Sequence, residues 1–455
     1  MELKKNDICE IQIIDMNQDG EGIGKKDGCP LFVKDSIIGD TVRVKIMKMK
    51  KNYGYARLEE IIIPSPHRVM PPCAVARQCG GCQLQAIDYR EQLRFKQERV
   101  AANLLRIGKI DGYKMYPIIG MDEPFRYRNK AQFPIGRDKN GRLIAGFYAG
   151  RTHVIIENKE CMLGVPENGE ILSRVLEFMN SYGIEPYCED SHTGLVRHVF
   201  IRKGFKTGEI MVCLVLNGRR LTHSDELVKS LRQVKGMTSI FLNVNTEKTN
   251  VILGKELIKL WGSDFITDKI GAVSYHISPL AFYQVNPIQT ERLYEKALEF
   301  ANLTGSETVW DVYCGIGTIS LFLARNARKV YGVEIIPEAI DNARENAVLN
   351  GLTNTEFFVG KAEEVMPEWY EKNRGKADVV VVDPPRKGCE PEVLRTIAAM
   401  EPRRVVYVSC DSATLARDLA IMKELGYEVR EVQTADMFPM TTHVETIVAL
   451  HRTDS

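Results

Sequence analysis

From about residue 307 onward, the chain alternates between apolar, strand-like runs and amphipathic stretches with helical spacing. Each run is almost wholly apolar up to a polar tip, as in TVWDVYC, KVYGVEI, ADVVVVDPPR and RRVVYVSCD. Strands without alternating polar side chains are buried on both faces, which is typical of a parallel sheet covered by helices. Helices are expected between them, as in PEAIDNARENAVLNG, where Pro337 stands in the first turn and Gly351 just past the end. The pattern predicts an α/β, Rossmann-like domain.

Polar side chains stand where four of these strands end. They are Tyr313, Glu334, Asp383 and Cys410. Ligands of such sheets bind at the carboxyl ends of the strands, so four polar ends on successive strands indicate a binding site. Cys410 turns the corner between a strand and a helix. Its position alone is compatible with a core thiol, a metal ligand, half of a disulfide or a nucleophile.

The segment DVYCGIG, residues 311–317, is a tight glycine turn between a strand and a helix, where backbone can approach a ligand closely. Glu334 ends the next strand, 19 residues beyond Gly315, and is placed to accept hydrogen bonds from ribose hydroxyls. Ser320 stands where a dinucleotide fingerprint would carry its last glycine. A single nucleoside therefore fits better than NAD, and S-adenosylmethionine is the common nucleoside ligand of this arrangement. The alternative is an ordinary helix-packing turn.

The composition fits a cytoplasmic protein of about three domains of roughly 100–200 residues each. The chain has 455 residues, of which 44% are hydrophobic and 27% charged, with a formal net charge of +1. We expect no membrane span, because no run of about 18 apolar residues occurs. We expect no signal peptide, because the start MELKKNDICEIQ has no apolar segment followed by a small-residue cleavage site. Eleven cysteines in a reducing compartment make a disulfide framework improbable. Nucleic-acid binding has to come from local patches, since the total charge is nearly balanced.

Residues 1–62 are predicted to form a small OB-like β-barrel, because short alternating runs are separated by turns rich in Gly and Asp, such as NQDGEGIGKKDG. The stretch from Thr41 to Leu58 carries six basic residues and no acidic one: Arg43, Lys45, Lys48, Lys50, Lys51 and Arg57. Tyr53 and Tyr55 lie among them. Cations for phosphates and rings for unstacked bases suit RNA binding. The alternative is a solvated strand edge protected by lysines.

Residues 63–265 read as a mixed α/β central domain, and residues 266–455 as the Rossmann-like domain. A strongly helical segment at 89–108 is expected to pack on the latter. The central domain opens with the spacing C-x5-C-x2-C at Cys73, Cys79 and Cys82. Three clustered thiolates with one distant cysteine favour a 4Fe–4S cluster over zinc, which usually uses two CxxC pairs. Candidates for the fourth ligand include Cys161, Cys188 and Cys213.

The segment DPPRKG at 383–388 follows a strand, and its paired prolines make Asp383 project from a rigid turn. A similar acidic-Pro-Pro element occurs in amino-methyltransferases, where an aromatic residue usually follows and stacks on the substrate base. Arg386 stands there instead. Together with Cys410, this difference argues against methylation of an amino group.

Several ordered motifs resemble those of the RNA uridine-C5 methyltransferases, specifically the iron–sulfur-containing branch that acts on 23S ribosomal RNA. The match covers nearly the whole chain: GEGIG with the basic strands, C-x5-CGGCQLQ, SPLAFYQVN, DVYCGIGT, VDPPRKG, VYVSCDSATLARDL and DMFPMTTHVE. The resemblance implies an RNA-binding TRAM barrel at the N-terminus and a cluster held by Cys73, Cys79, Cys82 and Cys161. It implies further that Cys410 is the nucleophile and Glu445 the base. Four residues are expected to contact S-adenosylmethionine: Gln284, Tyr313, Glu334 and Asp383.

The chemistry of the family explains these residue types. Uracil C5 is a poor nucleophile, and addition of a thiolate at C6 makes an enolate whose C5 attacks the methyl group. A base then removes the C5 proton before the thiolate leaves. The target uridine has to leave its stack to meet Cys410. Cys314 and Cys389 are interpreted as packing residues. His443, two residues before Glu445, is either a satisfied polar side chain or a group that orients the base or the RNA.

Three alternatives remain at this point. The RNA substrate is expected to be 23S ribosomal RNA, with tRNA as the alternative. A radical S-adenosylmethionine enzyme would use C-x3-C-x2-C spacing, which differs from the spacing of this chain. A non-catalytic RNA-binding assembly factor would have no need of Cys410 and Glu445. We expect a cytoplasmic monomer.

Overall fold

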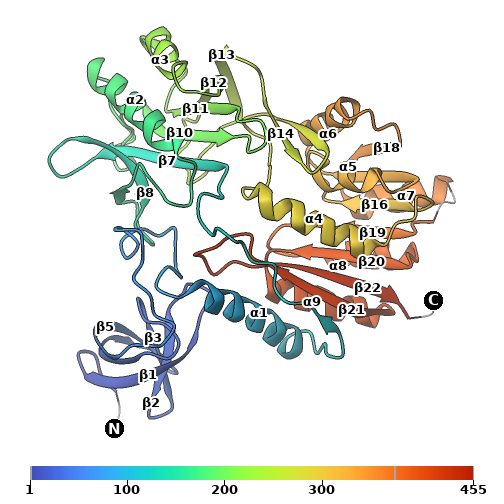
Figure 1. The fold of residues 1–455 in the computed structure, drawn as a ribbon, viewed down its shortest axis with the longest axis horizontal. Coiled ribbons are helices and arrows are strands. Elements are labelled where there is room, and N and C mark those ends of the chain that lie inside the picture. Colours follow the sequence, from blue (N-terminus) through green and yellow to red (C-terminus); the bar gives the residue numbers. More distant parts are fainter. Residues whose placement is uncertain (1–2, 374–375, 454–455) are drawn as a thin grey trace. The chain divides into compact units, whose positions relative to one another are not determined.

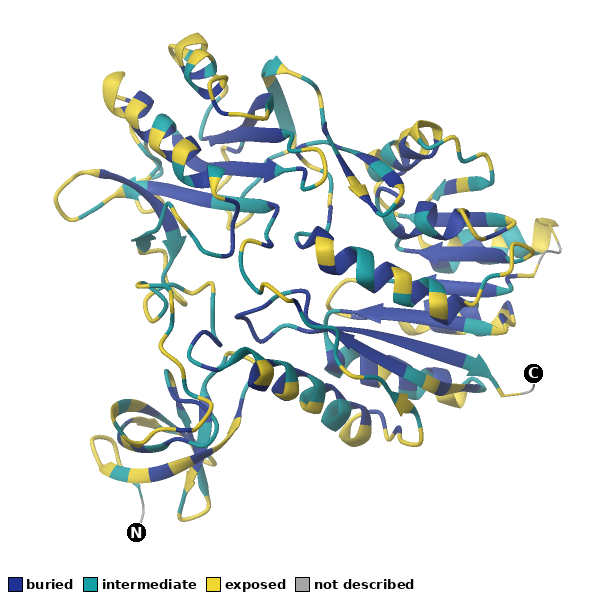
Figure 2. Cartoon of the chain, in the orientation of Figure 1, coloured by how far each residue is buried: buried dark blue, intermediate teal, exposed yellow. Residues whose placement is uncertain are grey.

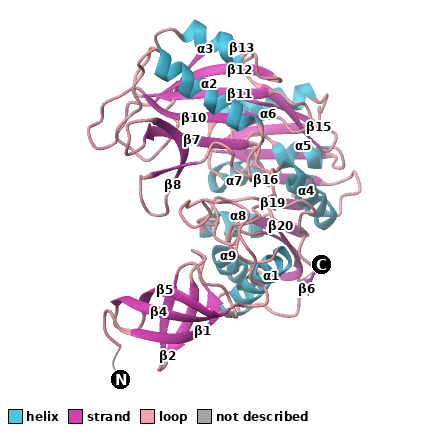
Figure 3. Cartoon of the chain, turned by 60° about the vertical axis from the view of Figure 1, so that its left-hand side comes forward, coloured by secondary structure: helices cyan, strands magenta, loops and turns pink. Residues whose placement is uncertain are grey.

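The computed structural model of the protein describes residues 3–373 and 376–453. The chain divides into two compact units, each built from three segments. The first comprises Met1–Lys96, Phe147–Ile156 and Phe438–His443, and the second Gln97–Gly146, Glu157–Met437 and Val444–Ser455. Figure 1 follows the chain through its elements, and Figure 3 separates helices from strands. In the described ranges, no helix has the length and apolar character needed to cross a membrane.

The first unit contains a closed barrel with the strand order β1-β2-β3-β5-β4. Its strands are β1 (Ile8–Met16), β2 (Gly22–Lys26), β3 (Cys29–Val33), β4 (Thr41–Met49) and β5 (Gly54–Ile63). Alternating residues such as Ile11, Ile13, Val42 and Val44 fill its core. The predicted OB-like barrel is confirmed. The expectation that NQDGEGIGKKDG is a turn is wrong in part: Gly22–Lys26 form β2, because pairing with β3 overrides the glycines' weak preference for strands.

A buried ion pair ties the connector after the barrel to the barrel itself. The carboxylate of Asp40 is fully buried and accepts hydrogen bonds from the backbone N–H groups of Ile37 (2.8 Å) and Ser65 (2.9 Å). It also accepts hydrogen bonds from the guanidinium of Arg68, through Nε at 3.1 Å and Nη2 at 2.5 Å. Each oxygen of the Asp40 carboxylate therefore accepts two hydrogen bonds from groups of this unit.

The segment between the barrel and the Rossmann-like region builds a seven-stranded sheet with the order β13-β12-β11-β10-β7-β8-β9. Its strands are β7 (Lys130–Arg137), β8 (Leu143–Tyr148), β9 (Ile155–Glu157), β10 (Val196–Lys203), β11 (Ile210–Leu216), β12 (Met237–Val244) and β13 (Glu256–Gly262). Two helices accompany it, α2 (Glu167–Ser181) and α3 (Ser224–Leu231). Strand β11 is buried along its whole length, as its apolar sequence predicts. This region is mixed α/β.

The Rossmann-like part is an eight-stranded sheet with the order β18-β17-β16-β19-β20-β22-β21-β6. Its strands are β6 (Lys114–Met115), β16 (Thr308–Val312), β17 (Lys329–Glu334), β18 (Thr355–Val359), β19 (Val379–Val382), β20 (Arg404–Ser409), β21 (Tyr427–Ala435) and β22 (Glu445–Arg452). The strands β16 to β20 are parallel, as predicted. Strand β22 runs antiparallel to both neighbours, so the sheet is mixed. Only residues 436–444 join β21 to β22, which is too short for a parallel crossover.

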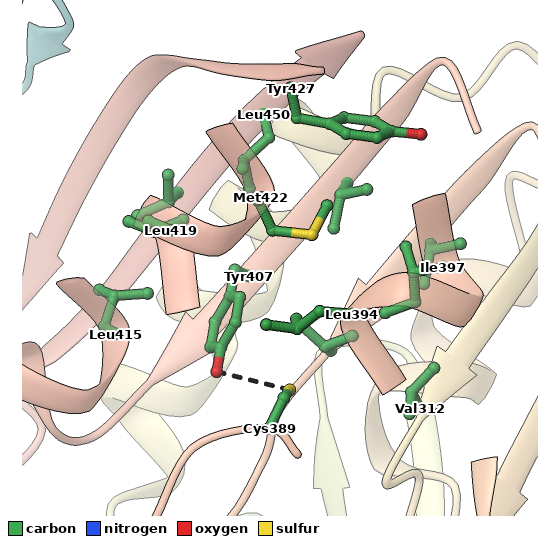
Figure 4. Close-up of a cluster of buried hydrophobic side chains, with 14 of the residues drawn as sticks. Val312, Cys389, Leu394, Ile397, Tyr407, Leu415, Leu419, Met422, Tyr427 and Leu450 are labelled. Carbon is green, nitrogen blue, oxygen red and sulfur yellow. Dashed lines mark hydrogen bonds between the residues drawn. The ribbon is translucent and has the colours of Figure 1, made fainter. Parts of the chain in front are cut away.

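Helices cover both faces of this sheet (Figure 1). They are α4 (Pro287–Ala301), α5 (Thr318–Ala324), α6 (Pro337–Leu349), α7 (Ala362–Asn373), α8 (Pro391–Ala399) and α9 (Ser412–Glu424), preceded by the hairpin of β14 (Ile266–Ile270) and β15 (Val273–Ile277). Val100 and Leu104 of α1 (Tyr89–Arg106) belong to the same core cluster as Leu415 and Leu419 of α9. Figure 2 shows the central strands buried throughout, and Figure 4 shows part of this core. Because the middle of the sheet is buried and apolar, polar functional side chains have to lie at the ends of its strands.

Candidate active site

Cys410 and Glu445 are brought together by the antiparallel pairing of β20 with β22. Ser409, the last residue of β20, pairs with Thr446, so the register places Cys410 opposite Glu445. Asp411 then caps α9, its Oδ1 accepting hydrogen bonds from the N–H groups of Ala413 (2.9 Å) and Thr414 (3.0 Å). The cap ends the strand and starts the helix at once. The half-buried thiol of Cys410 is therefore held on a sharp corner beside a carboxyl group.

The thiol of Cys410 lies in an environment that disfavours the thiolate. Burial, followed by the carboxyl groups of Glu445 and Asp383, raises its pKa to about 12, while the guanidinium of Arg386 opposes this shift. In the absence of ligands the thiol is therefore protonated at neutral pH. Positive charge brought to the site by a ligand would favour the thiolate.

The two carboxyl groups beside the thiol are also perturbed. Burial, followed by the charge of Asp383, raises the pKa of Glu445 to about 8, again opposed by Arg386. Burial raises the pKa of Asp383 to about 7. Groups poised near neutral pH can accept and return a proton during a reaction. Asp383, Cys410 and Glu445 thus form one electrostatically coupled group at the carboxyl edge of the sheet.

The glycine turn after β16 has the strained backbone of a ligand-binding loop. Tyr313 takes a left-handed conformation, with φ of +68°, which is unusual for an aromatic residue. Glu334 holds the turn from the next strand, its Oε2 accepting a hydrogen bond from the N–H of Gly315 at 3.3 Å. Its Oε1 accepts another from the N–H of Ile336 at 3.1 Å. Tyr313 therefore belongs to the turn, and Glu334 is hydrogen-bonded to the same turn from the neighbouring strand.

Asp311 is a site residue that the sequence reasoning missed. It is fully buried within β16, and one carboxyl oxygen accepts a hydrogen bond from the hydroxyl of Ser320. The other oxygen has no hydrogen-bond partner among the described residues. Burial, together with the charges of Asp383 and Glu334, raises its pKa to about 7. The available signal was an acidic residue inside an otherwise apolar strand, since buried acids usually have a function.

The segment with Gln284 is held at the same edge. The side chain of Asn129 donates to the carbonyl of Gln284 at 2.9 Å. Asn286 caps α4 and donates from Nδ2 to the carbonyl of Met437 at 3.0 Å, just before the segment that leads to Glu445. Tyr294 of α4 is buried near the acidic residues: burial and the nearby carboxylates, Asp383 first, raise the pKa of its hydroxyl. Gln284 thus lies two residues before the cap of α4, with its carbonyl held by Asn129.

The cysteines predicted as cluster ligands lie in both units. Cys73, Cys79 and Cys82 belong to the first and Cys161 to the second, and none of the four forms a disulfide in the described chain. The N–H of Gly81 donates to Sγ of Cys79 at 3.4 Å. No group of three or more His, Cys, Asp or Glu in the described ranges is arranged to hold a metal ion. The iron–sulfur site therefore stays a prediction.

Two other cysteines were open as fourth ligands, and one of them is a core residue. Cys213 is fully buried in β11, and burial raises the pKa of its thiol well above the usual value. Cys188 is exposed, and a hydrogen bond from the side chain of Ser191 lowers the pKa of its thiol. Cys314, beside the glycine turn, is buried.

On the barrel, three rings gather near the basic strand. Phe32, Tyr53 and Tyr55 have ring centroids 5.6–5.7 Å apart. Two of the six predicted basic residues are engaged elsewhere, because Arg43 pairs with Glu10 and Glu60, and Arg57 pairs with Glu59. The neighbouring exposed cations are those of Lys48, Lys50 and Lys51. Rings and lysines thus remain together as the candidate RNA surface.

Comparisons with known proteins agree with this geometry. The family described as tRNA (Uracil-5-)-methyltransferase matches residues 88–453, and the TRAM domain family matches residues 3–58. An uncharacterized RNA methyltransferase of Halalkalibacterium halodurans is 52% identical over 449 residues, which cover 98% of each chain. One from Clostridium acetobutylicum is 51% identical over 455 residues, covering 99% of this chain and 98% of the other.

Among solved structures, one similar over its whole length is a tRNA (uracil-54, C5)-methyltransferase of Pyrococcus abyssi in complex with S-adenosyl-L-homocysteine. The match has a TM-score of 0.78 and 28% sequence identity, and it covers 97% of this chain and 100% of the other. The likeness includes the barrel and the Rossmann-like part, since little of either chain lies outside it.

Proposed function

Because this chain belongs to the tRNA (uracil-5-)-methyltransferase family and is an S-adenosylmethionine-dependent RNA (uracil-C5)-methyltransferase with a TRAM domain, we propose that it methylates a specific uridine of 23S ribosomal RNA through Cys410 and Glu445. The observation that supports the two catalytic roles is the β20–β22 register, since the pairing of Ser409 with Thr446 makes Cys410 and Glu445 neighbours. The choice of 23S ribosomal RNA is based on the cysteine spacing and the N-terminal barrel. Membership of this family argues against the two alternatives named above, a non-catalytic assembly factor and a radical S-adenosylmethionine enzyme.

The chemistry divides between the two residues. The thiolate of Cys410 adds to C6 of the uracil, and the electron pair of the C5–C6 bond passes into an enolate. S-adenosylmethionine supplies the methyl group and, when bound, a positive sulfonium charge. That charge favours the anionic forms of Cys410, Asp383 and Glu445, whose pKa values are all raised in its absence. After C5 has taken the methyl group, Glu445 removes the C5 proton, and the C6–S bond breaks to restore the double bond and the thiolate.

Four residues are assigned to cofactor binding. Glu334 would accept hydrogen bonds from the ribose hydroxyls, and its carboxylate already lies at the glycine turn. Tyr313, on the strained side of that turn, would contact the cofactor next to it. Gln284 and Asp383 lie at the end where the base would bind. The unpartnered buried oxygen of Asp311 supports a polar ligand here, since such an atom is costly without a partner.

We assign Cys73, Cys79, Cys82 and Cys161 to a 4Fe–4S cluster. The donor set has the right chemistry: four half-buried cysteines without disulfide bonds, and an N–H donated to one sulfur, as is common around cluster ligands. Anaerobic reconstitution should give about four iron and four sulfide per chain, and Cys→Ser changes at these positions should lower both. Cys213→Ser is the matched control and should leave them unchanged, since Cys213 lies in the core.

The functional parts follow from these assignments. Residues 1–62 act as the RNA-binding barrel, residues 63–265 carry the cluster, and residues 266–455 carry out methyl transfer. The enzyme works as a cytoplasmic monomer. The gathered rings and lysines on the barrel support its role in binding single-stranded RNA.

A second candidate substrate is tRNA, which the solved enzyme from Pyrococcus abyssi and the description of the family both name. The deciding experiment maps 5-methyluridine in 23S ribosomal RNA and in tRNA from cells that lack this protein. Loss of a 23S site, restored by the wild-type chain and not by Cys410→Ala, supports the proposal. Loss confined to tRNA supports the second candidate, and loss in neither RNA contradicts both.

A further inference from the structure

Helix α9 does more than follow Cys410, because its side chains hold the loop that comes directly after Asp383. This loop, residues 384–389, lies within the connection from β19 to α8. The hydroxyl of Thr414 donates to the carbonyl of Arg386 at 3.1 Å. Arg417 donates from Nη2 to the carbonyls of Lys387 (2.9 Å) and Cys389 (3.3 Å). Three backbone carbonyls of the loop, at positions 386, 387 and 389, are therefore held by side chains of this helix.

Asp418 is the centre of these contacts. It is fully buried, and its Oδ2 accepts hydrogen bonds from the N–H of Cys389 (2.8 Å) and from the hydroxyl of Tyr407 (2.6 Å). Its Oδ1 accepts another from Nε of Arg417 at 2.8 Å. Hydrogen bonds to a buried carboxylate are roughly twice as strong as neutral ones. The carboxylate thus joins the strand before Cys410, the loop after Asp383 and the helix itself.

The loop is shaped to bring its backbone close to this carboxylate. Gly388 has φ of +78°, and a Cβ added there would lie 2.4 Å from Oδ2 of Asp418. The hydroxyl of Tyr407 also lies 3.5 Å from Sγ of Cys389, the contact drawn in Figure 4. Tyr313 packs against the core cluster to which Cys389 and Tyr407 belong. The network therefore reaches from α9 to the glycine turn.

The catalytic groups lie at the ends of these restrained segments. Cys410 immediately precedes the cap of α9, and Asp383 immediately precedes the loop that α9 holds. Tyr313 packs against the core cluster that includes Cys389, at the end of that loop. A shift of the loop relative to the helix would therefore change the distance from Asp383 to Cys410. Such shifts cost rate and affinity even when they are about 1 Å, because the reacting groups lose their alignment.

We propose that Asp418 is a positioning residue, which with Arg417 locks the 384–389 loop onto α9 and so sets Asp383 and Tyr313 for the cofactor beside Cys410. The proposal rests on the function assigned to Asp383 and Tyr313 above. The alternative is a buried ion pair that only stabilises the fold. The two differ in what a conservative change does to the folded enzyme.

The test compares Asp418→Asn with Asp40→Asn in the full-length protein. Both positions are fully buried carboxylates that accept backbone N–H groups and pair with one arginine, but Asp40 lies between the barrel and its connector. The melting temperature is measured first. The dissociation constant for S-adenosylmethionine is then measured calorimetrically, at a temperature where both variants are folded.

Asp418→Asn should weaken cofactor binding about tenfold. This factor corresponds to the free energy of about one hydrogen bond to a charged group. Asp40→Asn should lower the melting temperature and leave cofactor binding unchanged. Equal affinity of Asp418→Asn and wild type would overturn the proposal. An equal loss of affinity in both variants would overturn it too, since the effect would then follow stability alone.

If Asp418→Asn does not fold, Tyr407→Phe decides, because it removes one hydrogen bond to Asp418 and one to Cys389 while keeping the ring. A weakening of about threefold or more supports the proposal, and wild-type affinity contradicts it. Tyr313→Phe separates the two levels of inference. If Tyr313→Phe does not change cofactor affinity, the assignment of Tyr313 to cofactor binding is wrong. The cofactor affinity of Asp418→Asn then still tests whether Asp418 positions Asp383.

Discussion

Glu445→Gln should make the protein more stable at alkaline pH and at the same time stop its reaction. Glu445 is only 4% exposed, and its pKa rises from 4.5 to about 8 on folding, first through burial and then through Asp383. At 1.36 kcal/mol for each pH unit, keeping it charged in the folded state costs up to about 5 kcal/mol. Glutamine has nearly the same shape and never bears this charge.

The pH range of the effect follows from the direction of the shift. Because the folded-state pKa is raised, the unfolded chain loses its proton first, and stability falls as pH rises from 4.5 through about 8. The variant should match the wild type near about pH 5 and exceed it by about 2–5 kcal/mol near about pH 9. Urea unfolding at both pH values measures this difference. Equal stability at the higher pH would refute the burial argument.

The same variant tests the role of Glu445 in the reaction. Without a base, the methylated adduct keeps its C5 proton and the C6–S bond to Cys410 persists, so turnover should fall about 10²–10⁴-fold. Ordinary uridine RNA, mixed with the variant and S-adenosylmethionine, should give a complex that survives a denaturing gel. Wild-type enzyme should show little of it, because it completes elimination. Normal turnover of Glu445→Gln would show that another group removes the proton.

Three further outcomes are expected. Cys410→Ala should abolish the denaturation-resistant complex with 5-fluorouridine RNA, which the wild type should form because the methylated adduct has no C5 proton to lose; a complex formed by the variant would contradict the nucleophile assignment. Replacing both Tyr53 and Tyr55 with Ala should weaken RNA binding in a filter or anisotropy assay by about 1–3 kcal/mol per stacked base, without changing cofactor affinity, and unchanged RNA binding would rule out the barrel rings as a stacking surface. Gly388→Ala should lower stability in thermal unfolding by more than about 1 kcal/mol, because the added Cβ meets the carboxylate of Asp418 at a left-handed backbone position; wild-type stability would show that the loop moves freely there.

Much of the fold could be predicted because its signals are local. The apolar runs that became β16, β17, β19 and β20, and the helix starting at Pro337, carry their patterns within a few residues. Strand β2 was missed for the opposite reason. Its glycines indicate a turn, and only pairing with β1 and β3 makes the segment a strand.

The parallel strands predicted from the apolar runs are confirmed, but the antiparallel strand β22 was not foreseen, for a related reason. An apolar run buried on both faces does not encode its direction, and β22 has such a run. The direction follows from the short connection after β21, which leaves no room for a crossover helix. This reversal has a functional consequence, because it brings the start of β22 to the edge where β20 ends.

The sequence alone determined the fold class, the residue types of the site and their placement at strand ends, because periodicity and motif spacing are written in neighbouring residues. The tertiary structure decided which of those residues are neighbours and how deeply each is buried. It made Glu445 a neighbour of Cys410 across paired strands, and it buried the acidic side chains so that their pKa values rise toward neutrality. It also hydrogen-bonded Asp418 to the loop that follows Asp383. These properties depend on burial and on pairing between segments far apart in the chain, which no local pattern records.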